Sequence, residues 1–293
     1  MEKAIRRGQL NNDFKFFHLK DKSDTQFEHH FHDFNKIIVF IFGNVIYNIE
    51  GKSYKLMPWD ILFVPRNQVH KPMVEPDEEY ERIVIWINDD FLKEHGNAEN
   101  NLLTCFDLAR ENKHLLRLGK TSINSIKQIL SKLELEVNNT QFGSGILCNA
   151  LFVEFIVYIN RLRINPDEHV DNIEVQFDEQ IQKIIKYINS NIGSDLSIDA
   201  LSKRFYINKY YLMHKFKANT GCSIHSYVNN KRIQRCAAYI KDGLSPAEAA
   251  SKCGFNDYSN FVRAFSKMFG FPPRKYCKNQ VDEQVYEIDN KNP

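Results

Sequence analysis

The sequence predicts a two-domain α+β protein, with a β-rich N-terminal part and an all-α C-terminal part. Short alternating apolar runs separated by turn residues fill residues 27–87. Helical patterns fill residues 178–277, and one segment within them occurs twice. A length of 293 residues also suits two domains better than one.

Each element of the N-terminal part follows from its pattern. Five runs are typical of strands: 37–42, 45–49, 53–56, 61–64 and 82–87. Such short, closely spaced strands favour a small barrel or sandwich over about 25–90. Two helices should follow at 122–137 and 146–162, and the second is apolar over much of its circumference. We therefore expect it to cover the barrel on one side and a second copy of the chain on the other, so that the helices at 121–164 form a homodimer. An internal helical hairpin with no role in dimerisation is the alternative.

The expected domains are 1–164, a polar acidic linker at 165–176, a helical domain at 177–280 and an acidic tail at 281–293. Residues 177–280 carry 17 Lys and Arg against 7 Asp and Glu, a net charge of +10, whereas residues 1–176 carry −5. A basic domain beside an acidic one suggests a polyanion as the partner of the basic domain, although a solvated basic face would give the same count.

The repeat decides between these readings. Ser197 and Ser245 are 48 residues apart, and after one inserted residue the offset becomes 49 for Leu212 and Phe261. Each copy reads as a short helix, a turn and a second helix: 198–204 then 209–220 in the first, and from Pro246 then up to Gly270 in the second. A long helix at 224–241 joins them, and a helix at 178–189 precedes them. Paired helix-turn-helix units point to double-stranded DNA, because a helix fits the major groove.

The segment GFNDYSNFVRAFSKMFGFPPRKY, with YLMHKFKANTG in the first copy, resembles the C-terminal signature of the AraC/XylS family of bacterial transcription regulators. The resemblance covers roughly residues 178–277. It implies two recognition helices that enter successive segments of the major groove, about 34 Å apart. By position, the base-reading residues of the family fall on Tyr210, Met213, His214, Ser259, Asn260, Val262 and Arg263. Arg263 is the strongest candidate, since Arg pairs with guanine O6 and N7. A phosphate contact is its alternative, and helix-surface packing is the alternative for Tyr210.

Several basic side chains are better suited to phosphate contacts or plain solvation than to base reading: Lys209, Lys215, Lys217, Lys252, Lys267 and Arg274.

The strands of the N-terminal part resemble a cupin, a double-stranded β-helix barrel with a metal-binding His-x-His and a later His. His30, His32 and His70 fit that spacing, but Lys36 occupies the place of the usual Glu, and a cation there opposes metal binding. We therefore expect no metal and no cofactor. A metal-dependent cupin enzyme fused to a DNA-binding domain is kept as an alternative.

Members of the AraC family often carry such a barrel as the site of a small effector, frequently a sugar. The residues expected to line this site are His30, His32, His70, Arg82, Trp86 and Trp59. Alternation places Arg82, Val84 and Trp86 on one face of a strand, where Arg82 would bind a polyol or a carboxylate and Trp86 or Trp59 would stack on a sugar ring. A barrel without a ligand is the alternative.

The sequence thus predicts a sequence-specific DNA-binding transcription regulator, not an enzyme, controlled by a small effector, with RNA polymerase as a further partner. An effector-free regulator is the remaining alternative. No nucleotide-binding Gly-rich loop or nucleophile elbow occurs. The absence of a run of about 18 apolar residues and of a signal-peptide pattern predicts a cytoplasmic protein without a membrane span. The six scattered cysteines are expected to be reduced.

Overall fold

A computed structural model describes residues 10, 13–22, 27, 29–75, 78–165 and 175–276, together with the backbone of Ile5–Arg6. The chain divides into two compact units, one of residues 7–176 and one of residues 177–293 with residues 1–6. Most of the predicted linker and the whole acidic tail lie outside the described residues. The strands are β1 (Ile5–Arg6), β2 (Phe14–Lys22), β3 (His30–Phe31), β4 (Asn35–Phe42), β5 (Val45–Ile49), β6 (Lys52–Lys55), β7 (Ile61–Val64), β8 (His70–Val74), β9 (Glu79–Ile87), β10 (Leu115–Leu116) and β11 (Val175–Phe177).

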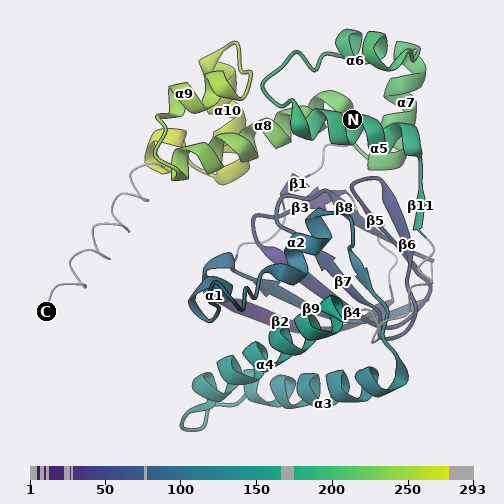
Figure 1. The fold of residues 1–293 in the computed structure, drawn as a ribbon, viewed down its shortest axis with the longest axis vertical. Coiled ribbons are helices and arrows are strands. Elements are labelled where there is room, and N and C mark those ends of the chain that lie inside the picture. The colour runs from purple at the N-terminus through teal and green to yellow at the C-terminus, as the bar shows by residue number, and fades with distance from the viewer. Residues whose placement is uncertain are drawn as a thin grey trace, which may run out of the picture. The chain divides into compact units, whose positions relative to one another are not determined.

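Two antiparallel sheets face each other in the first unit (Figure 1). One contains β3, β8, β5 and β6 in that order, and the other runs β10-β7-β4-β9-β2. Because side chains alternate along a strand, β4 contributes residues to two hydrophobic cores, one on each of its faces. Ile38 and Phe40 pack between the sheets with Tyr47 of β5, whereas Ile37 and Val39 pack on the outer, helix-covered face.

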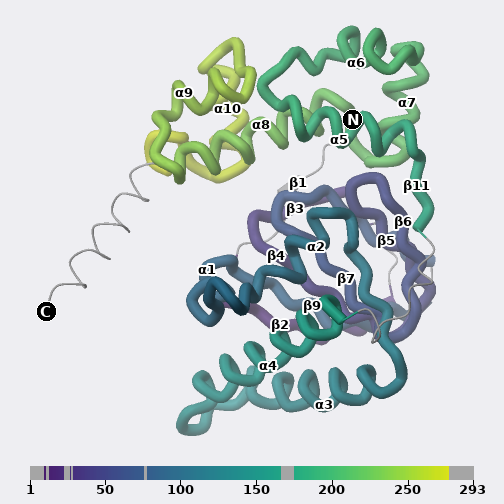
Figure 2. The backbone as a smooth tube through the Cα atoms, viewed as in Figure 1, coloured from purple at the N-terminus to yellow at the C-terminus, as the bar shows by residue number. Residues whose placement is uncertain are grey.

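Four helices belong to this unit: α1 (Asp89–Glu94), α2 (Thr104–Arg110), α3 (Lys120–Val137) and α4 (Ser144–Ile164). The predicted helices at 122–137 and 146–162 are confirmed, each slightly longer than expected. α3 and α4 form a hairpin beside the β10-β7-β4-β9-β2 sheet (Figure 2). α4 buries Phe152, Phe155 and Ile159 completely in the core that it shares with that sheet.

Among the described residues, α4 is also the single helix long and apolar enough to cross a membrane by length and composition. It is not an uninterrupted apolar run, because Asn149, Glu154 and Asn160 lie within it. A third of that apolar window, 33 %, is buried inside the protein, and Phe152, Phe155 and Ile159 are among its buried residues.

The sequence patterns found only part of the barrel. The five predicted strands are present within a residue or three of their expected ends. β2 was missed, although it pairs with β9 over nine positions from Phe14↔Ile87 to Lys22↔Glu79. Its burial pattern shows why, since none of its residues is fully buried and its C-terminal half is mostly exposed. The barrel therefore begins near residue 14 rather than near residue 25.

The second unit is helical. It contains α5 (Glu179–Ser190), α6 (Ile198–Phe205), α7 (Lys209–Thr220), α8 (Ile224–Lys241), α9 (Pro246–Lys252) and α10 (Tyr258–Phe269). The predicted bounds of α7 and α8 are confirmed to the residue. Figure 1 shows α8 as the rod between the α6–α7 pair and the α9–α10 pair. α8 buries Tyr227, Ile233, Ala237 and Ile240.

Side-chain caps and glycines define the ends of these helices. Ser197 caps α6 and Ser245 caps α9, and Ser245 forms a full capping box with Glu248. Asn208 caps α7 and Asp257 caps α10, each through a side-chain oxygen that accepts from the first turn. Gly221 and Gly270 end those two helices in the left-handed conformation.

Candidate functional site

The two predicted recognition helices present matched faces. Leu212 and Phe216 of α7 and their repeat partners Phe261 and Phe265 of α10 are each 0 % exposed. Side chains four residues apart share a helix face, so these pairs anchor each helix to its unit. The opposite faces are therefore free to meet a partner.

On α7 the outward face consists of large side chains. Tyr210 is 68 % and Met213 45 % exposed, and His214 is exposed as well. The rings of Tyr210 and His214 lie 4.2 Å apart, so one braces the other on the helix surface. The helix-packing alternative for Tyr210 describes this ring contact, but most of the Tyr210 side chain still faces solvent.

On α10 the outward face is smaller and more polar. Ser259, Asn260 and Arg263 are exposed, and Val262 is partly buried. Arg263 Nη2 donates a hydrogen bond of 2.6 Å to Asn260 Oδ1. This bond holds the guanidinium along the helix surface and leaves its other N–H groups for a partner.

A cavity of about 400 Å³ lies in the first unit, between the sheets. Its walls come from β2, β3, β4, β5, β8 and β9 and from residues outside the strands: Phe17, Leu19, Phe27, His30, His32, Lys36, Ile38, Tyr47, Pro72, Tyr80, Arg82, Val84 and Trp86. The predicted alternation of Arg82, Val84 and Trp86 is confirmed, since all three line it. Strand register explains the grouping, because Lys36 pairs with Trp86 and Ile38 with Val84.

The histidines form a cluster at this cavity. His30 and His32 line it, and the ring of His70 lies 4.3 Å from that of His30 and 4.8 Å from that of His32. Nδ1 of His32 is 2.7 Å from the Phe34 carbonyl oxygen and Nδ1 of His70 is 2.9 Å from that of Gln68, so each Nδ1 carries the proton. Burial, followed by neighbouring Lys36 for His32 and His30 for His70, lowers both pKa values well below the usual value. These two imidazoles are therefore neutral near pH 7.

The donor set does not fit a metal. Among the described residues, no group of three His, Cys, Asp or Glu side chains is arranged to hold an ion. Lys36, at the position where a cupin carries its Glu, lines the same cavity. A cation at that place repels a metal ion, so we derive no step through one.

Trp59 has to be removed from the predicted pocket. It is not part of the cavity wall and packs instead on the helix-covered core, with Lys127 Nζ 4.5 Å above its ring. Its turn has a left-handed backbone at φ 72°, which directs the chain in a way that strand alternation does not predict. His70 contributes through its contacts with His30 and His32 rather than as a wall residue.

Family models match parts of both units. The model of the AraC-like ligand binding domain matches residues 16–155, and the model of a helix-turn-helix domain matches residues 201–279. The chain belongs to the AraC family of transcription regulators.

Relatives of the whole AraC-family chain are distant. The HTH-type transcriptional activator RhaR of Salmonella dublin is 23 % identical over 259 residues, which cover 87 % of this chain and 89 % of that protein. RhaR of Mannheimia succiniciproducens is 21 % identical over 84 % of this chain and 86 % of its own length. Among solved structures, apo ToxT K231A of Vibrio cholerae matches 91 % of this chain and 97 % of its own at 18 % identity, with a TM-score of 0.38. The C-terminal domain of the response regulator yesN of Fusobacterium nucleatum matches 34 % of this chain and 99 % of its own at 24 % identity, with a TM-score of 0.33.

The basic residues of this AraC-family domain differ in their surroundings. Lys215 Nζ forms an ion pair of 2.7 Å with Asp178, the N-cap of α5, and donates to Gln180, so it is engaged within the domain. Lys209 pairs with Asp199, and Lys252 Nζ lies 4.6 Å above the ring of Tyr239. Lys217, Lys267 and Arg274 are exposed.

Sequence reasoning missed one set of positioning residues in the AraC-family domain. Arg232 of α8 donates from Nε to the Ile192 carbonyl at 3.0 Å and from Nη2 to the Ser194 carbonyl at 2.7 Å. These carbonyls lie in the loop between α5 and α6, so the connecting helix is tied to the first helix-turn-helix unit. Arg232 and Ala237 of the connecting helix are part of the family resemblance, but the sequence does not show which groups Arg232 contacts.

Proposed function

We propose that this AraC-family protein is a cytoplasmic transcription activator that reads a two-part DNA site with α7 and α10. The observation that supports it most is the matched pair of helix faces. Each helix is anchored by two fully buried apolar residues, and each exposes its predicted base readers on the opposite side. Two such helices in one basic domain suit successive turns of the major groove.

The division of labour within each face follows from side-chain chemistry. Arg263 and Asn260 carry donors and acceptors suited to base edges, and Ser259 and Val262 complete the α10 surface. Tyr210, Met213 and His214 give α7 a surface for apolar contact with bases and for hydrogen bonds. Lys217, Lys267 and Arg274 are assigned to phosphates, because they are exposed and no described ion pair engages them. Lys215 is reassigned to holding α5 against α7, through Asp178.

The barrel cavity is the proposed effector site. A volume of about 400 Å³ lies within the range of small-molecule sites, and its wall is mainly apolar with a few polar groups. His30, His32, Arg82 and Trp86 are its proposed contacts, with His70 behind the first two. Effector binding would shift the regulator between states that hold the DNA-binding domains differently, since a ligand acts by its unequal affinity for two states. The alternative of a metal-dependent enzyme has no support from the described donor set.

A homodimer through the helices at 121–164 is part of the proposal. The α3–α4 hairpin exposes large apolar side chains near its turn: Leu135 at 73 %, Phe142 at 107 %, Ile146 at 78 % and Leu147 at 48 %. Exposed apolar groups that gather on one region favour a protein contact. Sedimentation velocity would test the homodimer, because Phe142→Asp should shift a dimer toward monomer. Leu19→Asp lies in the cavity wall and therefore tests a separate site. An unchanged sedimentation coefficient for Phe142→Asp would remove the hairpin from the interface.

As an activator, the dimer would also contact RNA polymerase.

The function is tested by gel shift and footprinting on the DNA upstream of the genes beside its own. We expect a discrete footprint covering two major-groove segments on one face. Arg263→Ala should weaken binding by about 1–3 kcal/mol and relax preference at one position. Lys183→Ala, an exposed change on α5 away from both recognition helices, is the matched control and should leave the footprint unchanged. A uniform loss across all sequences for Arg263→Ala would make Arg263 a phosphate contact.

A further inference from the structure

The cavity wall carries two basic side chains, and one of them is paired with a carboxylate, that of Asp21. Lys36 and Arg82 both line the cavity. Register brings them to the same face of the sheet, since Phe40, four residues along β4 from Lys36, pairs with Arg82. Arg82 is 7 % exposed, and Lys36 reaches the solvent only partly.

Arg82 is already partly neutralised. Its Nη1 donates to Asp21 Oδ1 at 2.6 Å and to the Tyr80 carbonyl oxygen at 2.9 Å. Asp21 is about half exposed, with 49 % of its side chain accessible, so it pairs with the Arg82 guanidinium from the solvent-exposed side. Nε and Nη2 of Arg82 donate no hydrogen bond to any described residue and are available to a ligand.

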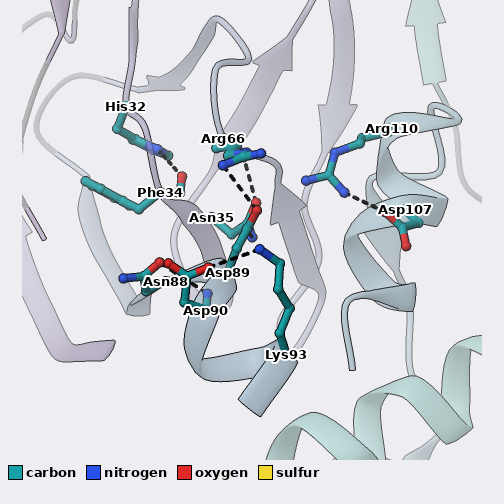
Figure 3. Close-up of polar contacts among 10 residues, drawn as sticks. All are labelled: His32, Phe34, Asn35, Arg66, Asn88, Asp89, Asp90, Lys93, Asp107 and Arg110. Atoms are coloured by element: carbon teal, nitrogen blue, oxygen red, sulfur yellow. Dashed lines mark hydrogen bonds and ion pairs between the residues drawn. The ribbon is translucent and has the colours of Figure 1, made fainter. Parts of the chain in front are cut away.

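Lys36 has no such partner among the residues that the structure describes. The nearest buried acid by sequence register, Asp89, is engaged elsewhere, as Figure 3 shows. Asn35 Nδ2 donates to Asp89 Oδ1, Arg66 Nη1 lies 3.3 Å from Asp89 Oδ2, and the Arg66 backbone N–H donates to Asn35 Oδ1 at 3.0 Å. Because neighbours on a strand point to opposite faces, Asn35 and Asp89 lie on the helix side, away from the Lys36 side chain.

The rest of the wall offers apolar surface, tyrosine hydroxyl groups and one imidazole acceptor, the Nε2 atom of neutral His32, which has no hydrogen-bond partner among the described residues. Phe17, Leu19, Ile38 and Val84 are apolar, and the ring of Trp86 stacks 4.6 Å from that of Phe34. Burial raises the pKa of both Tyr47 and Tyr80, so their hydroxyls stay protonated and can donate. A neutral sugar presents many hydroxyl donors and needs acceptors such as Asp, Glu, Asn or Gln. The described wall contains none of these four residue types.

We propose that the cavity is built for a small monocarboxylate, whose carboxyl group is bound by Lys36 and Arg82 and whose apolar body lies against Trp86 and its neighbours. This deepens the proposed effector site and rests on it. When Lys36 is protonated, it and Arg82 carry two positive charges against one negative charge on Asp21, so one further negative charge completes the site. An unpaired charge is costly to bury, and a carboxylate removes that cost by pairing with it.

The site also predicts a pH dependence. Burial, with a smaller contribution from Arg82, lowers the pKa of Lys36 to about 7. The other groups at the wall are His30 of β3, His32 just after it, Tyr47 of β5, and Tyr80 with Arg82 of β9. Asp21 of β2 pairs with Arg82, and His70 of β8 lies next to His30. The neighbouring β7 places Val64, which does not titrate, beside Lys36. A carboxylate would hold Lys36 protonated, so binding takes up a proton when the pH lies above 7.

Three matched pairs of compounds test the proposal on the full-length protein: octanoate with octan-1-ol, benzoate with benzyl alcohol, and gluconate with glucose. The first two pairs distinguish aliphatic from aromatic acids, and the third tests a sugar acid. We measure thermal shifts and titration calorimetry at about pH 6.5 and about pH 8.5, on either side of the pKa of Lys36. At least one acid should bind while its neutral partner does not. Its affinity should fall at the higher pH by about tenfold per unit above 7, as for a single required proton.

Two variants assign the effect. Lys36→Met keeps most of the side-chain volume, removes the charge and should weaken the acid at least about tenfold, the equivalent of about 1.4 kcal/mol. Lys36→Arg keeps a charge that does not titrate, so acid binding should persist and lose its pH dependence. Lys132→Met, an exposed change on α3, is the control for charge removal.

The possible results separate the acid proposal, the role of Lys36 and the effector site itself. Binding of a neutral partner as tight as that of its acid would overturn the monocarboxylate but leave the effector site in place. Acid binding that is unchanged in Lys36→Met would overturn the role of Lys36. Binding by none of the six compounds would overturn the acid proposal and count against the cavity as an effector site, while gel shifts on the same protein would still report its DNA binding separately.

Discussion

Gly193 and Gly254 meet backbone to backbone, because a Cβ on Gly254 would lie 2.8 Å from the Gly193 carbonyl oxygen. Gly193 belongs to the loop after α5, and Gly254 to the turn between α9 and α10. The contact joins the first helix-turn-helix unit to the second, next to the hydrogen bonds that Arg232 donates to Ile192 and Ser194. This close approach between the two units leaves no room for a side chain at Gly254.

Gly254→Ala should separate the two units. Gly254 has φ +79°, which costs an L-residue about 1–2 kcal/mol, and the added Cβ would also contact the Gly193 carbonyl and the Arg232 guanidinium. We expect a loss of about 2–4 kcal/mol in the free energy of unfolding, measured by urea denaturation. Gly243→Ala is the matched control, because Gly243 has φ +94° and open space around it. Equal losses for the two variants would mean that the contact contributes nothing.

Tyr206→Gly should stabilise the domain. Tyr206 occupies the turn position that Gly254 occupies 48 residues later, with φ 54° and 96 % of its surface exposed. Glycine removes the strain of the left-handed backbone, but it also raises the conformational entropy of the unfolded chain. The net gain in the free energy of unfolding should be about 0.5–1 kcal/mol. Tyr206→Ala keeps the strained backbone and should give no gain. If Ala and Gly raise the urea midpoint equally, the strain is not the cause.

Arg232→Lys should loosen the tie between α8 and the loop after α5. Lysine keeps the charge but cannot serve both carbonyl groups, and each lost hydrogen bond costs about 0.5–1.5 kcal/mol. We expect weaker discrimination between DNA sites whose two halves are spaced differently, measured by gel shift on spacing variants. Arg235→Lys on the exposed side of the same helix is the control. Undiminished spacing preference in Arg232→Lys would contradict the tie.

Lys215 and Lys217 should behave differently on DNA. Lys217→Ala should lower the slope of log affinity against log salt by about 1, the mark of one lost phosphate contact. Lys215→Ala should instead lower thermal stability, because it breaks the pair with Asp178, and leave the salt slope unchanged. The reverse pattern would restore Lys215 to the phosphate contacts.

Lys36→Met should stabilise the barrel in a pH-dependent manner. The pKa of Lys36 is about 7 in the folded state and 10.5 as the ordinary value. Between those values the unfolded chain binds the proton and the folded chain does not, so wild-type stability rises with pH. The advantage of Lys36→Met should be largest at pH 7 and below and shrink by at most about 1.4 kcal/mol per pH unit above it. An advantage that does not change between about pH 7 and pH 9 would show that Lys36 is not buried as a charge.

Local signals predicted the DNA-binding domain well. Capping residues, helix-ending glycines and inward-facing pairs such as Leu212 and Phe216 are visible in the sequence and were confirmed in the fold. The barrel was harder, because β2 and β8 are partly exposed and carry no clean alternation. Trp59 was misplaced because its left-handed turn is set by tertiary contacts. The contacts among Gly193, Arg232 and Gly254 depend on long-range packing and have no local signature in the sequence.

The most direct test of the account is a footprint of the wild-type protein and of two single variants, Tyr210→Ala and Arg263→Ala, on one operator and its point mutants. If α7 and α10 read successive major-groove segments, each variant should lose preference at its own base position, and the two positions should lie about one helical turn, roughly 10 base pairs, apart. Loss of preference at the same position, or an equal loss of affinity for every sequence in both variants, would contradict it.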